Sequence, residues 1–296
     1  MPQPAAQPIK PSRPGSPVGV SVIIPMYREA ARINQTLRDA IPLLAAAEQF
    51  AEIVLVDDGS PDDTVARVTP ALTDTPEGSL RAVRLIRHEH NRGKGAAVRT
   101  GLAAAVGTWR LIMDADNAAT VRELPKLLAT AKPGVGLVAG SRVAQGALVD
   151  AVPGRRFAGS VFKLALHLLG LDLLADTQCG FKLYRADLAE QVAAHGCEDG
   201  YAFDLEHLLI TQAAGLRAVE VGIAWTHKAG GQVSPVIDGL RMLRRAAAIR
   251  ARRSEIKSST TPLPSTLPER DEPPVVVTVP EAFPSSQPRK ARQPAS

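Results

Sequence analysis

Short apolar runs alternate with longer amphipathic stretches over most of the chain. Each run is rich in Val, Ile and Leu and is bounded by turn-forming residues, which is typical of strands buried on both faces of a sheet. Each run is followed by a stretch with apolar residues at helical spacing. The predicted strands cover residues 18–24, 53–56, 81–86 and 111–113. This alternation predicts an α/β fold with a mostly parallel sheet and helices on both faces.

The second half of the chain continues the pattern less regularly. The sequence predicts a strand over 134–139, a short strand after a polar loop at 176–182, a helix over 200–214 and a strand over 218–225. Between residues 153 and 174, apolar positions recur at helical spacing with basic residues between them. This stretch is either a helix packed on the core or a helix lying in a membrane interface.

The two ends of the chain differ from the middle in composition. Residues 1–17 and 254–296 are rich in proline and lack apolar periodicity, so we expect both to be disordered tails. The predicted folded domain covers residues 18–235, and a basic amphipathic helix follows over 236–253. The predicted apolar stripe of that helix consists of Val236, Leu240, Leu243 and Ala247.

The chain carries a formal net charge of +5, and many of its arginines lie within residues 241–257. Such a balance permits nucleic acid, an anionic membrane surface or a phosphorylated substrate as a partner. We expect no nucleic acid, because no aromatic residues interleave these arginines. The two cysteines fit a reducing cytosol. No secretory signal is visible in the sequence, and no apolar run reaches the ~18 residues that a spanning helix needs. We therefore expect a cytoplasmic protein without a transmembrane helix, held peripherally at the cytoplasmic face of a membrane.

Polar residues follow several predicted strands directly. Because right-handed crossovers bring the carboxyl ends of parallel strands to one edge, Pro25, Asp57, Arg92 and Asp114 are expected at the same edge. Asp114 and Asp116 are spaced i and i+2, so both carboxylates can point toward one place. Hard divalent ions such as Mg²⁺ or Mn²⁺ favour such oxygens. The alternative is a structural one, in which Asp116 or Asn117 caps the following helix.

Residues 91–95, with the sequence Asn-Arg-Gly-Lys-Gly, precede a predicted helix. Their glycines and the helix N-terminus favour a bound anion, with Lys94 as a mobile cation, unless the segment is only a structural turn. The spacing is neither that of a P-loop nor that of a dinucleotide fingerprint. Asp57 and Asp58 could hydrogen-bond a base or a ribose, or serve only the turn. Together these features predict a site for a nucleoside diphosphate bridged by a divalent cation.

Seven short polar segments occur in a characteristic order: 25–29, 56–62, 91–95, 114–116, 140–142, 176–182 and 203–206. Their order resembles that of family 2 glycosyltransferases with the GT-A fold. The last two segments resemble the branch that acts on polyprenyl phosphates, the dolichyl-phosphate β-glucosyltransferases and related mannosyltransferases. Residues 114–120, Asp-Ala-Asp-Asn-Ala-Ala-Thr, look more like the glucosyl type.

The resemblance implies a role for each matching residue. Asp114 and Asp116 would hold the metal and the diphosphate, Asp176 and Gln178 would lie beside the sugar, and Tyr27, Glu29 and one of Asp57 or Asp58 would hold the nucleoside. The implied donor-binding set is Pro25, Tyr27, Glu29, Asp57, Asp58, Arg92, Gly93, Lys94, Asp114 and Ala115. The implied acceptor-phosphate residues are Arg142, Arg156 and Ser160. The implied catalytic set is Asp116, Arg142, Asp176 and Gln178.

We therefore expect an inverting transferase that moves glucose from UDP-glucose to a polyprenyl phosphate at a membrane surface. The alternatives are mannose transfer from GDP-mannose, transfer to a soluble hydroxyl with Asp204 as general base, or a catalytically silent nucleotide-sugar binder.

Overall fold

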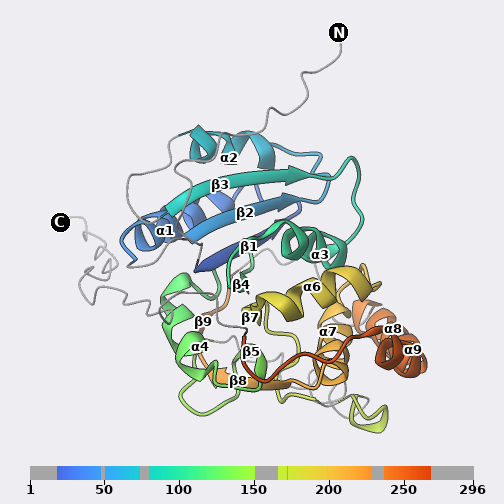
Figure 1. Cartoon of the computed structure of the whole chain (residues 1–296). Coiled ribbons are helices and arrows are strands. Elements are labelled where there is room, and N and C mark those ends of the chain that lie inside the picture. The colour runs from blue at the N-terminus through green and yellow to red at the C-terminus, as the bar shows by residue number, and fades with distance from the viewer. Residues whose placement is uncertain are drawn as a thin grey trace, which may run out of the picture.

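The computed structural model describes residues 19–47, 51–73, 80–150, 166–171, 173–228 and 237–267. Within these ranges a seven-stranded sheet has the order β3-β2-β1-β4-β7-β5-β8 (Figure 1). Two further strands, β6 (Leu148–Asp150) and β9 (Ala224–Thr226), pair separately. The strands of the main sheet are β1 (Val20–Met26), β2 (Ala51–Asp57), β3 (Leu80–Arg87), β4 (Trp109–Ile112), β5 (Val135–Ser141), β7 (Lys182–Arg185) and β8 (Arg217–Gly222).

The predicted mostly parallel sheet is confirmed, with one strand reversed. Strands β1 to β4 are mutually parallel, and β5 is parallel to β8. Parallel pairing requires a crossover connection between the strands, which helices supply here. Strand β7 lies between β4 and β5 and is antiparallel to both. Lys182, the first residue of β7, pairs with Ile112 and with Ala139. The start of β7 therefore lies at the edge where the parallel strands end.

Helices cover both faces of the sheet, as predicted. One apolar core lies between the sheet and α1, α2, η1 and α4, and a second lies between the sheet and α3, α6, α7, α8 and α9. The helices of the first face are α1 (Ile33–Ala45), α2 (Thr64–Thr73), η1 (Val121–Glu123) and α4 (Leu124–Thr130). Those of the second face are α3 (Lys94–Ala104), α6 (Ala186–His195), α7 (Phe203–Ala213), α8 (Ile237–Ala251) and α9 (Arg253–Ser259).

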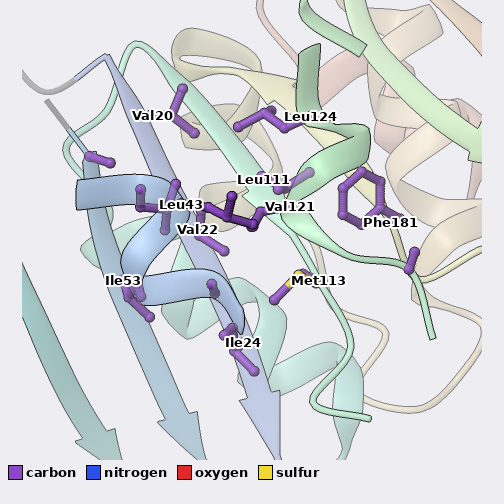
Figure 2. Packing of buried hydrophobic residues seen from close by; sticks show 14 of the residues in the cluster. Val20, Val22, Ile24, Leu43, Ile53, Leu111, Met113, Val121, Leu124 and Phe181 are labelled. Atoms are coloured by element: carbon purple, nitrogen blue, oxygen red, sulfur yellow. The ribbon is translucent and has the colours of Figure 1, made fainter. Parts of the chain in front are cut away.

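The first core is shown in Figure 2. Leu43 of α1 and Leu124 of α4 point toward the sheet residues Val22 and Leu111, and all four are buried. Phe181, just before β7, closes the same core and is 1% exposed. Burial of each large side chain of this kind contributes about 1.5–3 kcal/mol. This core fixes β4, and with it the loop that follows the strand.

Two predicted elements differ at their ends. The strand predicted over 218–225 is broken at Ile223, so that β8 belongs to the main sheet and β9 pairs with β6. The disordered tail predicted from residue 254 is wrong at its start, since α9 is helical to Ser259. Its Ile256 is 2% exposed in the second core, which explains why the helix continues. Leu263 then donates its backbone N–H to the Ala214 carbonyl at 2.9 Å.

The predicted apolar stripe of the last helix is wrong at Ala247, which is exposed, whereas Leu243 is partly buried. Among residues 241–251 of α8, Ala246 and Ile249 are buried. Two arginines of this helix contact the domain: Arg245 pairs with Glu198, and Arg250 donates to the Leu169 carbonyl. Most of the helix predicted over 153–174, and residues 1–17 with 268–296 of the predicted tails, lie outside the described residues.

Candidate active site

The predicted convergence of strand ends at one edge is confirmed. Met26, the last residue of β1, pairs with Asp57, the last residue of β2. The end of β4 lies beside β1, and the start of β7 lies beside β4. Backbone N–H groups of the β1 loop bind side chains of the β2 loop: Arg28 donates to the Ser60 hydroxyl at 3.0 Å, and Glu29 to the Thr64 hydroxyl at 2.8 Å. These bonds hold the two loops together as one wall of the site.

The loop after β4 presents Asp114 and Asp116 on either side of a buried residue. Ala115 is 4% exposed, and its carbonyl accepts a hydrogen bond from the Thr36 hydroxyl at 2.6 Å. Asn117 has a φ of 59°, a left-handed conformation that Asn adopts more readily than most residues, and its side chain donates to Asp39. Asp116 Oδ1 accepts the Ala118 N–H at 3.0 Å, which closes a local turn. The following helix begins only at Val121 and has no side-chain cap, so the capping alternative is wrong. The turn leaves both carboxylates partly exposed.

Lys94 reaches this loop from the start of α3. Its Nζ lies 2.6 Å from Asp114 Oδ1. Burial alone lowers the pKa of Lys94, but the adjacent Asp114 carboxylate outweighs that effect and raises the pKa. Lys94 is therefore charged at neutral pH and sits at the carboxylate pair, where it can also meet an anionic ligand.

The donor set at this edge fits a divalent cation that is shared with a ligand. Burial raises the pKa of Glu29; its partner Arg32 opposes this, and Asp116 and Asp114 add to the rise, so three carboxylates lie within electrostatic reach of one another. Among the described residues, no group of three or more His, Cys, Asp or Glu is arranged to hold an ion by itself. Mg²⁺ in proteins is commonly held by one or two carboxylates with phosphate oxygens and water completing the shell. Asp114 and Asp116 would supply the two carboxylates.

The expected anion-binding amides of residues 91–95 are used within the protein. Asp58 accepts the N–H groups of Arg92 at 3.0 Å and Gly93 at 2.8 Å. The Asp199 carbonyl accepts the N–H of Gly95 at 2.7 Å. A Cβ at Gly93, whose φ is 110°, would overlap that same carbonyl. The glycines are therefore explained by the close approach of the loop around Asp199, and that part of the anion prediction is wrong; Lys94 remains as the cation.

Asp57 and Asp58 have different surroundings. Asp58 is fully engaged, because it also accepts a 2.7 Å contact from His88 Nδ1. Asp57 Oδ2 accepts the Ser60 N–H at 3.2 Å and lies 3.3 Å from Arg87 Nε. Asp57 Oδ1 is buried and has no hydrogen-bond partner among the described residues. Since a buried acceptor without a partner is costly, Asp57 is the carboxylate with capacity for a ligand.

The other predicted donor residues lie along the same wall. Pro25 is buried within β1 opposite Val56, and Tyr27 is partly exposed with the Arg28 guanidinium 5.3 Å from its ring centre. Glu29 is bound by both ends of the Arg32 guanidinium at 2.6 and 2.7 Å. The side chain of Arg92, in the loop of residues 91–95, is exposed.

The structure pairs two residues to which the resemblance gave separate roles. Arg142, after β5, binds both oxygens of Asp176 with its guanidinium at 2.8 and 2.7 Å, and its backbone N–H binds the same carboxylate at 2.9 Å. Burial raises the pKa of Asp176, but these contacts with Arg142 outweigh it and lower the pKa overall. The guanidinium also lies 5.4 Å from the ring centre of Trp225. Arg142 is thus held in place, charged, and 34% exposed along its side chain.

The remaining predicted residues lie less centrally. Gln178 is partly buried, with Nε2 3.8 Å from the sulfur of Met242 in α8. Asp204 is 5% exposed and lies 2.8 Å from Lys182 Nζ, so it is not an accessible base. Arg156 and Ser160 lie outside the described residues.

Sequence reasoning assigned no role to Lys182 or Gly180. A methyl group at Gly180 would overlap the carboxylate of Asp114, so this glycine makes the room that Asp114 occupies. A lysine that begins a short buried strand is the signal that could have identified Lys182.

The site combines a mostly parallel sheet with an Asp-x-Asp pair, a lysine and a buried carboxylate that has one oxygen without a hydrogen-bond partner in the described part of the chain, all at the carboxyl edge. This is the architecture of a GT-A nucleotide-sugar transferase. The family model for Glycosyl transferase family 2 matches residues 21–193, more than half of the chain. The chain belongs to this family.

Curated relatives agree with this assignment. The chain is 32% identical over 248 residues to the dolichyl-phosphate beta-glucosyltransferase of Dictyostelium discoideum, covering 79% of this chain and 74% of that protein. It is 32% identical over 251 residues to the protein of the same name from Saccharomyces cerevisiae, covering 78% and 74%.

Solved structures share the fold. Glucosyl-3-phosphoglycerate synthase from Mycobacterium tuberculosis, crystallised with Mn²⁺, UDP-glucose and phosphoglyceric acid, superposes with a TM-score of 0.58 at 19% identity over 80% of each chain. The same enzyme with Mg²⁺ and UDP gives a TM-score of 0.56 at 20% identity, covering 80% of this chain and 79% of that one.

Proposed function

We propose that this protein is an inverting glycosyltransferase that moves glucose from UDP-glucose to a polyprenyl phosphate of the dolichyl type. The observation that carries the proposal is the Asp114 and Asp116 pair at the end of β4, with Lys94 Nζ 2.6 Å from Asp114. The names of the curated relatives, dolichyl-phosphate beta-glucosyltransferases, support the donor sugar and the acceptor class.

On the donor side, the wall formed by the β1 and β2 loops would hold the nucleoside. Asp57 Oδ1 would accept an N–H group of the base, because it is a buried acceptor at this wall that has no hydrogen-bond partner among the described residues. Tyr27 and Glu29 lie along the same wall. Asp114 and Asp116 would hold Mg²⁺ or Mn²⁺, which when bound would neutralise the charge that develops on the leaving diphosphate. Lys94 adds a second positive charge at that place.

On the acceptor side, the reaction needs positioning more than a base. A lipid monophosphate has a second pKa near ~6, so it is already anionic at neutral pH. Its oxygen attacks C1 of glucose, the bond from C1 to the UDP oxygen breaks, and the electron pair leaves with UDP. Arg142, oriented by Asp176, would bind the attacking phosphate. The buried, paired state of Asp204 argues against a soluble hydroxyl acceptor activated by that residue.

We further propose peripheral attachment to the cytoplasmic face of a membrane. No helix in the described part of the chain combines the length and the apolar character that crossing a bilayer requires. The exposed arginines of α8 and α9, Arg241, Arg244 and Arg253, would face anionic lipid, each contributing about 1 kcal/mol.

The direct test is transfer of labelled sugar into lipid. The purified full-length chain is incubated with polyprenyl phosphate in vesicles, Mg²⁺ or Mn²⁺, and either labelled UDP-glucose or labelled GDP-mannose. We expect chloroform-extractable, acid-labile label from UDP-glucose. Label from GDP-mannose alone would overturn the donor assignment, and UDP binding without transfer from either donor would indicate a silent nucleotide-sugar binder.

A further inference from the structure

A buried ion pair lies beneath the carboxylate pair of the site. Lys182, at the start of β7, places Nζ 2.8 Å from Oδ1 of Asp204, in the first turn of α7. Lys182 is 1% exposed and Asp204 is 5% exposed. Both side chains are therefore too deeply buried to contact a substrate.

Lys182 also binds the loop that precedes β7. Its Nζ donates to the Cys179 carbonyl at 2.5 Å. The next residue, Gly180, lies directly against the carboxylate of Asp114, with room for no larger side chain. The loop that carries Asp176 and Gln178 is thus anchored by Lys182 where it passes Asp114.

Asp204 extends the arrangement toward Lys94. Burial raises the pKa of Asp204, and the charges of Lys182 and Lys94 oppose that rise. The charge of Asp204 in turn helps to raise the pKa of Lys94, whose Nζ lies 2.6 Å from Asp114 Oδ1. The Lys182 and Asp204 pair and the Lys94 and Asp114 pair therefore act on each other electrostatically.

Stability alone does not account for a pair of this kind. Because taking two charges out of water costs several kcal/mol per ion, replacing a buried pair by apolar residues is often neutral or stabilising. A charged pair beneath a metal-side carboxylate instead resembles the outer partners that orient ligand side chains, whose loss typically lowers metal affinity or activity about 10–100-fold.

We propose that Lys182 and Asp204 are positioning residues that hold Lys94 and Asp114 in the geometry needed to bind the metal and diphosphate of the donor. This inference rests on the proposed function for the identity of the donor, but the geometry applies to any nucleoside diphosphate at this edge. It gives Asp204 a role different from the general base considered from the sequence.

The test compares Lys182→Met, Asp204→Asn and the double variant in the full-length chain. Each protein is assayed for thermal unfolding, for binding of UDP with Mn²⁺ by calorimetry without acceptor, and for kcat and KM in sugar transfer. We expect each single variant to be less stable, because one buried charge is left without its partner. We expect the double variant to regain most of that stability, yet to bind UDP with Mn²⁺ about 10-fold more weakly and to lose about 10–100-fold in kcat.

The same strand offers a matched control. Arg185 ends β7 at the opposite edge of the sheet, is 2% exposed, and pairs with Asp187 at 2.7 Å. Arg185→Met should lower the unfolding temperature while leaving UDP affinity and kcat unchanged. This control therefore separates the general effect of losing a buried cation of β7 from the specific effect of losing Lys182.

Two outcomes would overturn the proposal. The first is a stable double variant with wild-type UDP affinity and kcat, which would make the pair purely structural. The second outcome concerns Asp204→Asn, which keeps the shape of the side chain and can be tested even if the double variant does not fold. Unchanged UDP affinity in Asp204→Asn would also refute the positioning role. Because UDP binding is measured without acceptor, failure of glucose transfer by the wild type would contradict the proposed function and leave this test intact.

Discussion

Gly180→Ala tests whether the position of the Asp114 carboxylate limits catalysis. A Cβ built at Gly180 would lie 2.6 Å from Asp114 Oδ1 and closer still to Oδ2 and Cγ. Gly180 does not have a positive φ, so alanine fits its backbone without strain. The substitution therefore acts on one neighbouring side chain and not on the loop itself.

The size of the effect follows from these distances. Ordinary contact needs about 3.4 Å, so the carboxylate must move by about 1 Å or more, which disturbs its 2.6 Å contact with Lys94. A misplacement of about 1 Å in a catalytic group costs about 100-fold in rate, or about 2.7 kcal/mol of transition-state stabilisation. The cost in folding stability is small, since loss of a partly exposed ion pair is worth up to about 1 kcal/mol and alanine reduces the freedom of the unfolded chain.

The assay measures kcat and KM for transfer of labelled glucose, beside thermal unfolding of the same samples. We expect kcat/KM to fall about 100-fold with an unfolding temperature within a few degrees of the wild type. Gly136→Ala is the control, because its Cβ would meet the core atoms Leu216 Cδ1 at 2.7 Å and Leu188 Cδ2 at 3.0 Å. It should lower stability and leave kcat/KM unchanged.

Wild-type kcat/KM in Gly180→Ala would refute the reasoning, because the carboxylate would then tolerate the displacement. A fall in kcat/KM that matches a large loss of stability would point to misfolding and equally contradict the argument.

Three further predictions concern carboxylates of the site. Asp116→Ala should abolish transfer and leave the circular dichroism spectrum unchanged; wild-type turnover would remove its metal role. Asp57→Asn should weaken UDP binding about 10-fold. Asp58→Asn should mainly lower the free energy of unfolding, by about 1–3 kcal/mol, because the amides of Arg92 and Gly93 lose their carboxylate acceptor. Equal effects of the two variants on UDP affinity would contradict this distinction. Burial raises the pKa of Asp176, but Arg142 lowers it below the ordinary value overall. The stability that this carboxylate adds to the fold is therefore complete above the unfolded-state pKa of about 3.9, and it is lost as pH falls through the folded-state pKa. Asp176→Asn should therefore flatten the acid limb of unfolding temperature against pH below about pH 4, and an unchanged limb would count against the pairing.

The candidate site shows how far local sequence could be trusted. Asp114 and Asp116 were placed correctly at a strand end, because an apolar run followed by polar residues marks where a buried strand leaves the sheet. The sequence does not show which of Asp57 and Asp58 is available to a ligand. That depends on His88 and on the backbone of Arg92 and Gly93, which lie 30 to 35 positions after Asp58.

The glycines of residues 91–95 show the same limit. Their position before a helix is consistent with an anion site, but the Gly93 amide donates to the Asp58 carboxylate and the Gly95 amide to the Asp199 carbonyl. Nothing local to the loop indicates that a carbonyl about a hundred positions later in the chain will approach it. The pairing of Arg142 with Asp176 and the burial of Ile256 in α9 are likewise contacts between distant segments.

The sequence by itself determined the parallel strands, the edge at which they end and the carboxylate pair at that edge, because alternating buried strands and amphipathic helices leave few topologies open. Only the tertiary structure decided the reversed strand β7, which of the carboxylates have partners, and the Lys182 and Asp204 pair beneath Asp114. The physical reason is that apolar periodicity records which face of an element is buried. Hydrogen bonds and ion pairs depend on which other segment arrives at that face.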